Sequence, residues 1–360
     1  MPRSHAATAT TPGYVRTAVA AGQRFRTAPL RRPVRLGVVG AGSISSHYHL
    51  PSIAALAKSR PDLVEFAALC EPNVERAAAA RRFHPGALFG DLATLLKTAP
   101  LDCVEVIVPV PATKAVAIQC LRAGFPVLME KPAGASVAEA RAIAAAARRA
   151  KLPAMVAFNR RWTPLLNEAK AAVAGEKLLH VGVQFFRSRR DEDDFYSGTG
   201  IHGLDALRFL AGDVKSVYFE RAAQGRGLKP TCQAQLEFAS GARGEFTCYP
   251  QSGCNVERYT LVTEHTTVFV QLPVGWLVDK PGLIQVFREN KLERQARGEP
   301  HGSSAVDLAQ GGGFYFEIEA FLEGIQAGRF VSPQVPEVIQ SQALGLLLQN
   351  GRNGTTRLKP

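Results

Sequence analysis

A glycine-rich turn near residue 40 has the residue types and spacing that could bind a phosphate. It follows a short apolar stretch, and residues 40–45 match the pattern G-x-G-x-x-G/A with Ser45 in the third, small-residue position. Gly40 permits a tight turn, and Gly42 lets the backbone approach a pyrophosphate. The amides of Ser43 and Ile44 open the next helix, where they can meet phosphate charge. The turn predicts a dinucleotide site, with a purely structural turn as the alternative.

The elements around this turn alternate between short apolar strands and Ala-rich helices, which is typical of a parallel sheet with crossover helices. We expect strands at 34–40, 63–70, 101–108, 127–130 and 154–158, and helices at 43–59, 72–82, 113–123 and 135–150. From residue 178 strands dominate, at 178–188, 214–220, 231–238, 244–249, 258–263 and 266–272, with helices at 200–211, 314–327 and 336–351.

These patterns predict an α/β protein of two domains, and 360 residues are enough for two cores. We expect an N-terminal Rossmann dinucleotide-binding domain over residues 34–157. A C-terminal α/β domain over residues 158–360 would carry an open, mostly antiparallel sheet for substrate binding and oligomerisation. The C-terminal helix can pack back on the first domain.

A carboxylate, Glu71, follows the second expected strand. There it can accept a hydrogen bond from the ribose 2′-hydroxyl of the adenosine half of a dinucleotide. The same carboxylate would repel a 2′-phosphate, so Glu71 favours NAD over NADP. Arg76, Arg81 and Arg82 lie downstream and are able to reach a phosphate. Both NAD and NADP therefore remain possible cofactors. The alternative interpretation of Glu71 is a solvated acid in a turn.

Two further segments identify a family. Residues 130–132 read Glu-Lys-Pro after one strand, and residues 159–162 read Asn-Arg-Arg-Trp after the next. With the glycine turn, they closely resemble the glucose–fructose oxidoreductase/inositol dehydrogenase (Gfo/Idh/MocA) family of NAD(P)-dependent oxidoreductases. The resemblance runs from residue 34 to the C-terminus, and the Glu-Lys-Pro signature is its most specific part.

The resemblance implies roles for these residues. Lys131 would lie beside the nicotinamide at the carboxyl edge of the sheet, polarise a substrate oxygen and stabilise a developing alkoxide. Glu130 would order the cofactor or the lysine, and Pro132 would fix the turn as a cis-proline. Further contacts would come from Arg161 to the cofactor, and from Asn159 and Arg160 to the substrate.

Residues 109–113 resemble the family's loop beneath the nicotinamide, which commonly ends in His. Thr113 takes that place and can donate one hydrogen bond. Pro109 and Pro111 lack amide donors and stiffen a segment that must approach the cofactor closely. A plain Pro-rich connection is the alternative.

His202 and Asp205 are three residues apart in the expected helix 200–211 and share one face. The segment resembles the family pattern Asp-x-Gly-x-His-x-x-Asp, in which the His is a general acid/base for a substrate hydroxyl. An imidazole titrates near neutral pH and suits that role. Asp205 would orient His202 and raise its pKa. A packed or surface His is the alternative.

The first Asp of that pattern falls on Gly198, which can bind neither a hydroxyl nor a proton. Asp191, Asp193 and Asp194 lie just upstream, and a loop shift can bring one of them into its place. A solvated or lid loop is the other interpretation. The loss allows an altered substrate, a different proton relay, or a member that binds cofactor without efficient turnover.

Arginines bracket the expected active site in the sequence. If several of them converge, bidentate pairing would favour an anionic substrate such as a sugar acid or a phosphate, with Arg187 among the substrate-binding residues. Solvent-facing or structural arginines are the alternative. The five are Arg160, Arg161, Arg187, Arg189 and Arg190.

The net charge of +12 is concentrated in the first 35 residues, which contain seven Arg and no Lys, Asp or Glu. The rest of the chain keeps only +5, which gives little support to a nucleic-acid footprint. We interpret residues 1–33 as a basic, disordered arm, with a targeting or partner-binding arm as the alternative. No apolar run approaches the roughly 18 residues of a membrane span.

The six cysteines include no CxxC pair and indicate reduced thiols in a cytoplasmic protein. No His/Cys/carboxylate cluster has metal-ligand spacing, so we expect no catalytic metal.

The sequence therefore predicts an enzyme that moves a hydride between a carbinol carbon and NAD or NADP. Its substrate would be sugar-, sugar-acid- or cyclitol-like. The open sheet favours a homo-oligomer, a dimer or a tetramer, and no nucleic-acid or membrane partner is expected. One alternative is a cofactor-binding regulatory or inactive member of the same fold. Another is a nucleic-acid-associated protein that uses the arginine arm.

Overall fold

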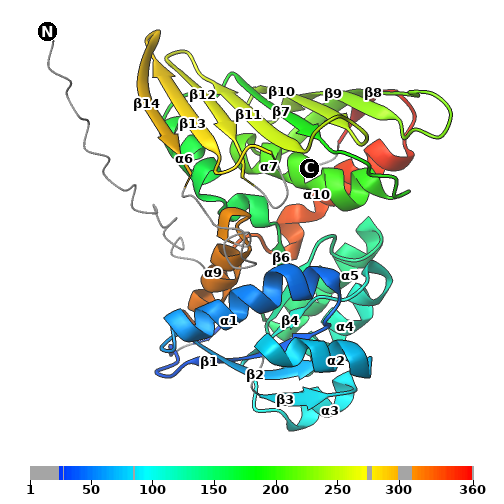
Figure 1. Ribbon diagram of the computed structural model, residues 1–360, viewed down its shortest axis with the longest axis vertical. Coiled ribbons are helices and arrows are strands. Elements are labelled where there is room, and N and C mark those ends of the chain that lie inside the picture. The colour runs from blue at the N-terminus through cyan, green and yellow to red at the C-terminus, as the bar shows by residue number, and fades with distance from the viewer. Residues whose placement is uncertain (1–23, 27, 84–85, 274–277, 299–309, 359–360) are drawn as a thin grey trace, which may run out of the picture.

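The computed structural model describes residues 24–26, 28–83, 86–273, 278–298 and 310–358. In this part of the chain the first half forms a six-stranded sheet and the second half a nine-stranded sheet, with helices between the two (Figure 1). The predicted α/β class, a Rossmann-type sheet followed by an open and mostly antiparallel sheet, is confirmed.

The first sheet is parallel, with the strand order β3-β2-β1-β4-β5-β6, so the order reverses beside β1. Ligands of open parallel sheets bind beyond the carboxyl ends of the strands at such a reversal. The short edge strand β3 was not among the expected elements, because three residues leave no periodicity to detect. The strands are β1 (Val34–Val39), β2 (Val64–Cys70), β3 (Ala87–Phe89), β4 (Cys103–Val106), β5 (Val127–Glu130) and β6 (Ala154–Ala157).

Helices cover both faces of this sheet, because successive strand residues point to opposite sides. Val104 and Val106 face the helices α4 and α5, whereas Cys103 packs with Ile53 of α1 and Ile318 of α9. The helices that follow the strands are η1 (Ser45–His49), α1 (Leu50–Ser59), α2 (Val74–Ala80), η2 (Arg81–Phe83), α3 (Leu92–Thr98), α4 (Val110–Arg122), α5 (Val137–Ala150) and η3 (Asn159–Trp162).

The second sheet has the order β14-β13-β12-β11-β7-β10-β9-β8-β15, and its described pairs are antiparallel except for β7 with β10. Three of its strands, β13 to β15, were not expected. The strands are β7 (His180–Phe186), β8 (Val214–Ala222), β9 (Thr231–Phe238), β10 (Arg243–Tyr249), β11 (Val256–Val262), β12 (Thr266–Gln271), β13 (Leu283–Arg288), β14 (Lys291–Arg297) and β15 (Gly354–Arg357).

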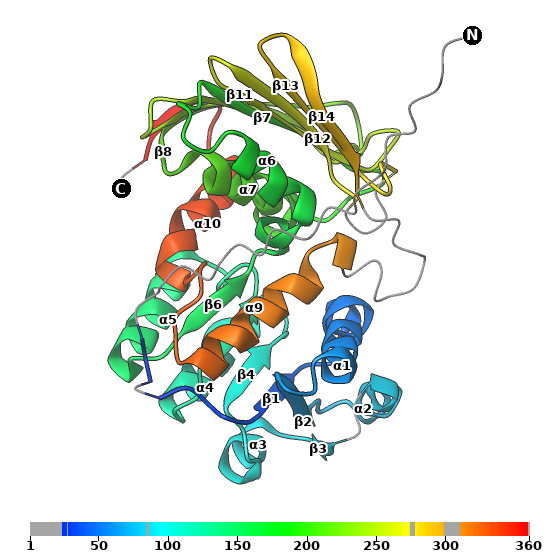
Figure 2. The same cartoon turned by 90° about the vertical axis from the view of Figure 1, so that its left-hand side faces the viewer.

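Helices cover only one face of the second sheet in the described chain. Below the sheet in Figure 1 lie α6 (Pro164–Ala172), α7 (Ile201–Ala211) and α10 (Val335–Asn350), and Figure 2 shows them on the same side. Buried and exposed residues alternate along its strands, as in β10, where Phe246 is buried and Glu245 is exposed. The outer face is therefore open.

The last two helices connect the two sheets. Ile318 and Phe321 of α9 (Phe314–Ala327) pack into the core beside β1 and α1, and Figure 2 shows α9 crossing that face. α10 places Val335 in the core of the first sheet and Leu344 in the core of the second. Both closing helices thus pack on the first domain as well, and the domain boundary at residue 157 stays a prediction.

The end of the N-terminal arm packs on the protein, so the prediction of disorder over residues 1–33 is wrong for its last part. The Leu30 amide donates to the Gln326 carbonyl at 2.7 Å, at the end of α9. Arg32 forms a bidentate ion pair with Asp102 at 2.6 and 2.9 Å. Burial raises the pKa of Asp102, but hydrogen bonds from Arg32 and Arg35 outweigh it and lower the pKa to about 2. The arm's residues 1–23 and 27 lie outside the described residues.

All six cysteines are free thiols, and five are buried. Among the helices that the structure describes, none is long and apolar enough to cross a membrane. No group of three or more His, Cys, Asp or Glu in the described ranges is placed to hold a metal ion.

Candidate active site

The glycine turn after β1 fits against the end of β4. Gly40 has a φ of +103°, and a Cβ built on it would lie 2.1 Å from the Ile107 carbonyl oxygen. Only glycine is compatible with this backbone conformation and this close approach. The buried Ser45 hydroxyl donates to the Gly40 carbonyl at 2.8 Å, which explains why a small residue stands in the third position of the motif.

The helix after the turn begins with η1, a π-helical turn that the sequence did not reveal. Pro51 has no N–H to donate to the His47 carbonyl four residues back, and η1 lies just before it. Single π-helical turns are frequent at functional sites. Here the turn places the buried His49 against the parallel sheet.

The turn fits a dinucleotide. A Cβ on Gly42 would meet no atom within 4 Å, and the side chain of Ile44 is 44% exposed, so the backbone of the turn is accessible. Glu71, directly after β2, accepts hydrogen bonds from the amides of Ala41 at 2.8 Å and Asn73 at 3.0 Å. A carboxylate has about four acceptor positions, so two remain for ribose hydroxyls. The residues that would hold the cofactor are Gly40, Gly42, Ser43, Ile44 and Glu71.

Residues 110–113 form the first turn of a helix and not the expected loop. Pro109 is the N-cap of α4, and Pro111 lies in the first turn, where a missing N–H leaves no hydrogen bond unmade. Thr113 is buried. The helix therefore starts three residues earlier than predicted, because proline at this position favours helix initiation. Contacts of these three residues with the cofactor stay a prediction.

Lys131 joins the two halves of the molecule. It follows β5 and is linked to Pro132 by the expected cis peptide bond. Its Nζ donates a hydrogen bond of 2.9 Å to the carbonyl oxygen of Gly198. Gly198 lies in η4 (Tyr196–Gly200), a second π-helical turn, directly before α7. The ammonium group therefore lies between the carboxyl edge of the parallel sheet and the start of α7.

The surroundings of Lys131 lower the pKa of its ammonium group. Burial lowers the pKa of Lys131, and the charges of Arg160 and Arg190 add to that effect. The carboxylates of Glu130 and Asp194 act in the opposite direction. A partly desolvated lysine of this kind is a stronger hydrogen-bond donor to a substrate oxygen than a solvated surface lysine.

A buried chain of three groups supports the turn that carries Lys131. His49 Nδ1 is 2.7 Å from Glu105, and His49 Nε2 is 2.9 Å from Glu130. Glu130 accepts in turn from the Lys131 amide at 3.0 Å. Burial lowers the pKa of His49, but the two carboxylates outweigh it and raise the pKa to about 10, so the ring is charged and donates from both nitrogens.

The sequence analysis missed this chain, although one signal for it was present. Glu105 is a charged residue inside the apolar strand β4, and it is 1% exposed. Buried charges require partners, so such an acid predicts a buried cation nearby. A further buried acid, Glu317 of α9, has no hydrogen-bond partner for either oxygen among the described residues. Burial raises the pKa of Glu317 well above its usual value, so this carboxyl group is neutral.

His202 is buried, and its surroundings favour the neutral form of its ring. It is buried in the first turn of α7, with its ring edge-on to Phe158 at 6.3 Å. Its Nδ1 has no hydrogen-bond partner in the described chain. Burial lowers the pKa of His202 well below 6.5, and the charges of Arg160 and Lys131 add to the shift. An unpaired buried nitrogen is costly unless a ligand supplies its partner.

Asp205 does not orient His202, and the expected rise in the pKa of His202 is wrong. The Asp205 carboxylate accepts two hydrogen bonds of 2.7 Å from Arg161 and a third from Ser341. A guanidinium binds both carboxylate oxygens and is a stronger partner than a neutral imidazole. Arg161 lines a separate hollow with Lys170 and Arg208, which argues against its predicted contact with the cofactor.

Arg160 and Arg187 do converge, but on a protein carboxylate. Both donate to Glu257 of β11, and all three side chains are buried. Asn159 accepts from Arg160 at 3.1 Å and donates to the Gly312 carbonyl at 2.6 Å. The convergence thus neutralises one positive charge and does not form the expected anion pocket. Glu257 had no signal in the sequence that pairs it with residues about 70 and 97 positions away.

Lys131 and His202 are the groups that this arrangement leaves for chemistry. One is a cationic donor, and the other is a neutral imidazole with a free nitrogen. Such a pair can hold a hydroxyl oxygen and move its proton. The pair lies at the carboxyl edge of the parallel sheet. The glycine turn that fits a dinucleotide follows β1 at the same edge.

This fold and site define an NAD-binding oxidoreductase. Residues 34–158 match the model of the oxidoreductase family with an NAD-binding Rossmann fold, and residues 180–268 match the model of the GFO/IDH/MocA C-terminal domain. The chain therefore belongs to the Gfo/Idh/MocA family.

The chain is similar to dehydrogenases of carbohydrates and cyclic diols. It is 33% identical to D-apiose dehydrogenase of Paraburkholderia graminis over 42% of this chain and 44% of that protein. It is 26% identical to trans-1,2-dihydrobenzene-1,2-diol dehydrogenase of Bos taurus over 89% of this chain and 96% of that one. A structure of levoglucosan dehydrogenase with NADH and levoglucosan superimposes with a TM-score of 0.73 at 20% identity, covering 89% of this chain and 97% of that chain.

Proposed function

We propose that this protein is a dehydrogenase that transfers a hydride between a carbinol carbon of a sugar- or cyclitol-like substrate and NAD. The observation that carries the proposal is the position of Lys131. Its Nζ lies at the carboxyl end of β5, bonded to the Gly198 carbonyl, and its charge helps to lower the pKa of His202. The names of the similar enzymes support an alcohol carbon as the reacting group.

In the oxidation direction Lys131 donates a hydrogen bond to the substrate oxygen and stabilises its growing negative charge. His202 accepts the hydroxyl proton on its neutral imidazole. The positive groups around His202 disfavour the imidazolium, so the proton does not remain there. When bound, the nicotinamide supplies the acceptor for the hydride. The reverse order describes reduction.

An assay of NADH formation with D-apiose, levoglucosan and trans-1,2-dihydrobenzene-1,2-diol tests the activity. Lys131→Ala should lower kcat at least about 100-fold, because a preorganised charge opposite a developing alkoxide is lost. Thermal stabilisation by NADH should remain. Lys114→Ala removes a surface lysine paired with Glu139 and is the matched control. Turnover that survives the loss of Lys131 would exclude this residue from the mechanism.

A preference for NAD over NADP follows from Glu71. A 2′-phosphate would face its carboxylate, which the amides of Ala41 and Asn73 hold in place. Two nearby arginines have local partners, since Arg81 donates to the Gly86 carbonyl and Arg82 stacks on Phe83. Glu71→Ala should lower the ratio of kcat/KM for NAD to that for NADP. An unchanged ratio would remove Glu71 as the determinant.

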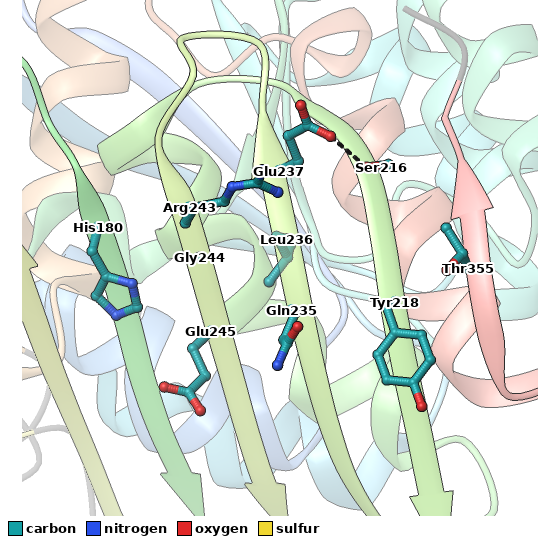
Figure 3. A pocket seen from close by; sticks show the side chains of 10 residues that line it. All are labelled: His180, Ser216, Tyr218, Gln235, Leu236, Glu237, Arg243, Gly244, Glu245 and Thr355. Atoms are coloured by element: carbon teal, nitrogen blue, oxygen red, sulfur yellow. Dashed lines mark hydrogen bonds between the residues drawn. The ribbon is translucent and has the colours of Figure 1, made fainter.

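Self-association through the open face of the second sheet is the second part of the proposal. Tyr218 and Phe269 are 47% and 44% exposed there. Figure 3 shows Tyr218 on this face among polar side chains such as Glu245 and His180, around a shallow hollow. Such a mixed, flat surface is typical of protein interfaces. Light scattering should show a dimer or a tetramer that Tyr218→Arg/Phe269→Glu dissociates, whereas Val74→Glu, another exposed apolar site, should not.

A cytoplasmic location is the last part, supported by the free thiols. Residues 1–23 need no role in catalysis in this scheme, and a chain starting at residue 24 should keep full activity.

A further inference from the structure

The space that a side chain at Gly198 would occupy borders the carboxylate of a residue four positions upstream. A Cβ built on Gly198 would lie 3.3 Å from Oδ2 of Asp194. The three atoms nearest to that Cβ position all belong to the Asp194 carboxyl group. The backbone at Gly198 is not in the left-handed region, so its conformation does not demand glycine.

One helical turn fixes both groups relative to Lys131. The Gly198 amide donates to the Asp194 carbonyl at 2.7 Å, which closes the turn that leads into η4. The Gly198 carbonyl accepts from Lys131 Nζ at 2.9 Å. Asp194 therefore starts the same turn that receives the lysine, with its carboxylate beside the turn and exposed to solvent.

Two of the neighbouring acids, Glu192 and Asp193, are engaged elsewhere. Asp193 forms an ion pair with Lys229 at 2.6 Å and is fully exposed. Glu192 binds Arg190 and the Thr199 hydroxyl. The Asp194 carboxylate has no hydrogen-bond donor among the described residues, and its charge acts on Lys131. Among the acids just before η4, Asp194 is the one whose charge is seen to act on Lys131.

We propose that Asp194 supplies the carboxylate that position 198 lacks and binds a substrate hydroxyl next to the oxygen held by Lys131. This rests on the proposed function. A carboxylate accepts strong hydrogen bonds from hydroxyl groups and repels a substrate carboxylate or phosphate. At this position the site therefore favours a substrate hydroxyl over a substrate carboxylate.

Asp194→Asn tests the assignment, in the full chain with whichever of the three assay substrates gives the highest turnover. We expect kcat/KM to fall about 10- to 100-fold, the effect of losing a hydrogen bond to a charged group. The alkaline limb of the pH profile should move to lower pH, since Asp194 raises the pKa of Lys131. Asp193→Asn is the matched control and should behave as the unmodified protein.

A second variant moves the carboxylate from position 194 to position 198, so that loss of the carboxylate can be distinguished from misfolding. Asp194→Ala removes the three atoms that crowd position 198, so Asp194→Ala/Gly198→Asp returns a carboxylate from the other side of the same space. This double variant should recover most of the activity that Asp194→Ala loses. Full activity of Asp194→Asn, or no recovery in the folded double variant, would overturn the proposal.

A titration of Lys131 Nζ by NMR with isotope-labelled lysine separates this proposal from the proposed function. Lys131→Arg assigns the signal. If no assay substrate turns over, the proposed function fails. A lowered Lys131 pKa in Asp194→Asn then still supports the placement of Asp194, and an unchanged pKa refutes it.

Discussion

Nε2 of His49 lies 2.9 Å from Glu130, so the first helical turn after the glycine loop is bonded to the turn that carries Lys131. The turn that would hold the cofactor and the turn that carries Lys131 are therefore connected through one buried cation, His49. Neither residue needs to touch a ligand for this bond to fix the distance between the two turns.

Replacing His49 should give a stability loss that depends on pH. The folded pKa of about 10 lies above the ordinary value of 6.5, so the stabilisation is fully present below pH 6.5 and is lost as the pH rises through about 10. His49→Gln should cost about 3 kcal/mol near pH 6, the scale of a broken buried ion pair, and much less near pH 10. Denaturant unfolding at several pH values measures this. His47→Gln, an exposed residue of the same turn, is the control, and a loss that does not change with pH would contradict the charged ring.

Replacing Glu317 should stabilise the protein at alkaline pH. Its pKa is raised by burial, so it stays neutral in the folded state while the unfolded chain ionises, and this penalises folding above its usual pKa of 4.5. Glu317→Gln keeps the shape and removes the penalty, which is about 1.4 kcal/mol for each pKa unit. The midpoint of thermal unfolding should rise near pH 8 and change little near pH 4.5. An equal effect at both pH values would show that Glu317 is not neutral.

Variants of Asp205 and His202 should affect different properties, stability for Asp205 and catalysis for His202. Asp205→Asn leaves the Arg161 guanidinium buried without its ion pair and should cost about 3–5 kcal/mol in the free energy of unfolding. His202→Asn breaks no hydrogen bond at Nδ1, so it should lower kcat and leave the unfolding midpoint nearly unchanged. Thermal unfolding and steady-state kinetics on both variants check this. The opposite pattern would return Asp205 to the chemistry.

Replacing Gly40 and replacing Gly42 should have different effects on the protein. Gly40→Ala places a methyl group 2.1 Å from the Ile107 carbonyl and should lower the unfolding midpoint. A Cβ at position 42 meets no atom within 4 Å in the protein, so Gly42→Val should leave stability nearly intact and block NADH binding. Thermal unfolding with and without NADH distinguishes the two. Normal NADH affinity in Gly42→Val would place the pyrophosphate elsewhere.

The sequence predicted those site features that are local along the chain. Gly40 and Gly42 are set by one strand–turn–helix unit, and Lys131 follows its strand directly. The partners of charged groups were not predicted. Asp205 meets Arg161 across 44 residues, and Glu257 meets Arg160 across 97, so no spacing rule connects them. A three-residue spacing suggested a pair of His202 and Asp205, but the Arg161 guanidinium binds the Asp205 carboxylate instead.

Two of the strands that escaped prediction, β14 and β15, lack an alternating apolar pattern. β14 has the sequence KLERQAR and is mostly exposed, so no apolar face marks it as part of a sheet. β15, at the opposite edge of the sheet, has three small or polar residues besides its terminal Arg357. Both strands are defined by pairing with a neighbour and not by their own burial.

The packing of α9 beside β1 and α1 makes the two halves of the chain inseparable in practice. A fragment that ended near residue 158 would contain every strand of the parallel sheet, yet it would leave Ile53 and Cys103 without the cover of Ile318 and Phe321. The surface exposed in this way would be apolar, and the fragment would aggregate before it bound any nucleotide. Gene fusions and domain-swapped chimeras of this enzyme should therefore carry the closing helices together with the dinucleotide half.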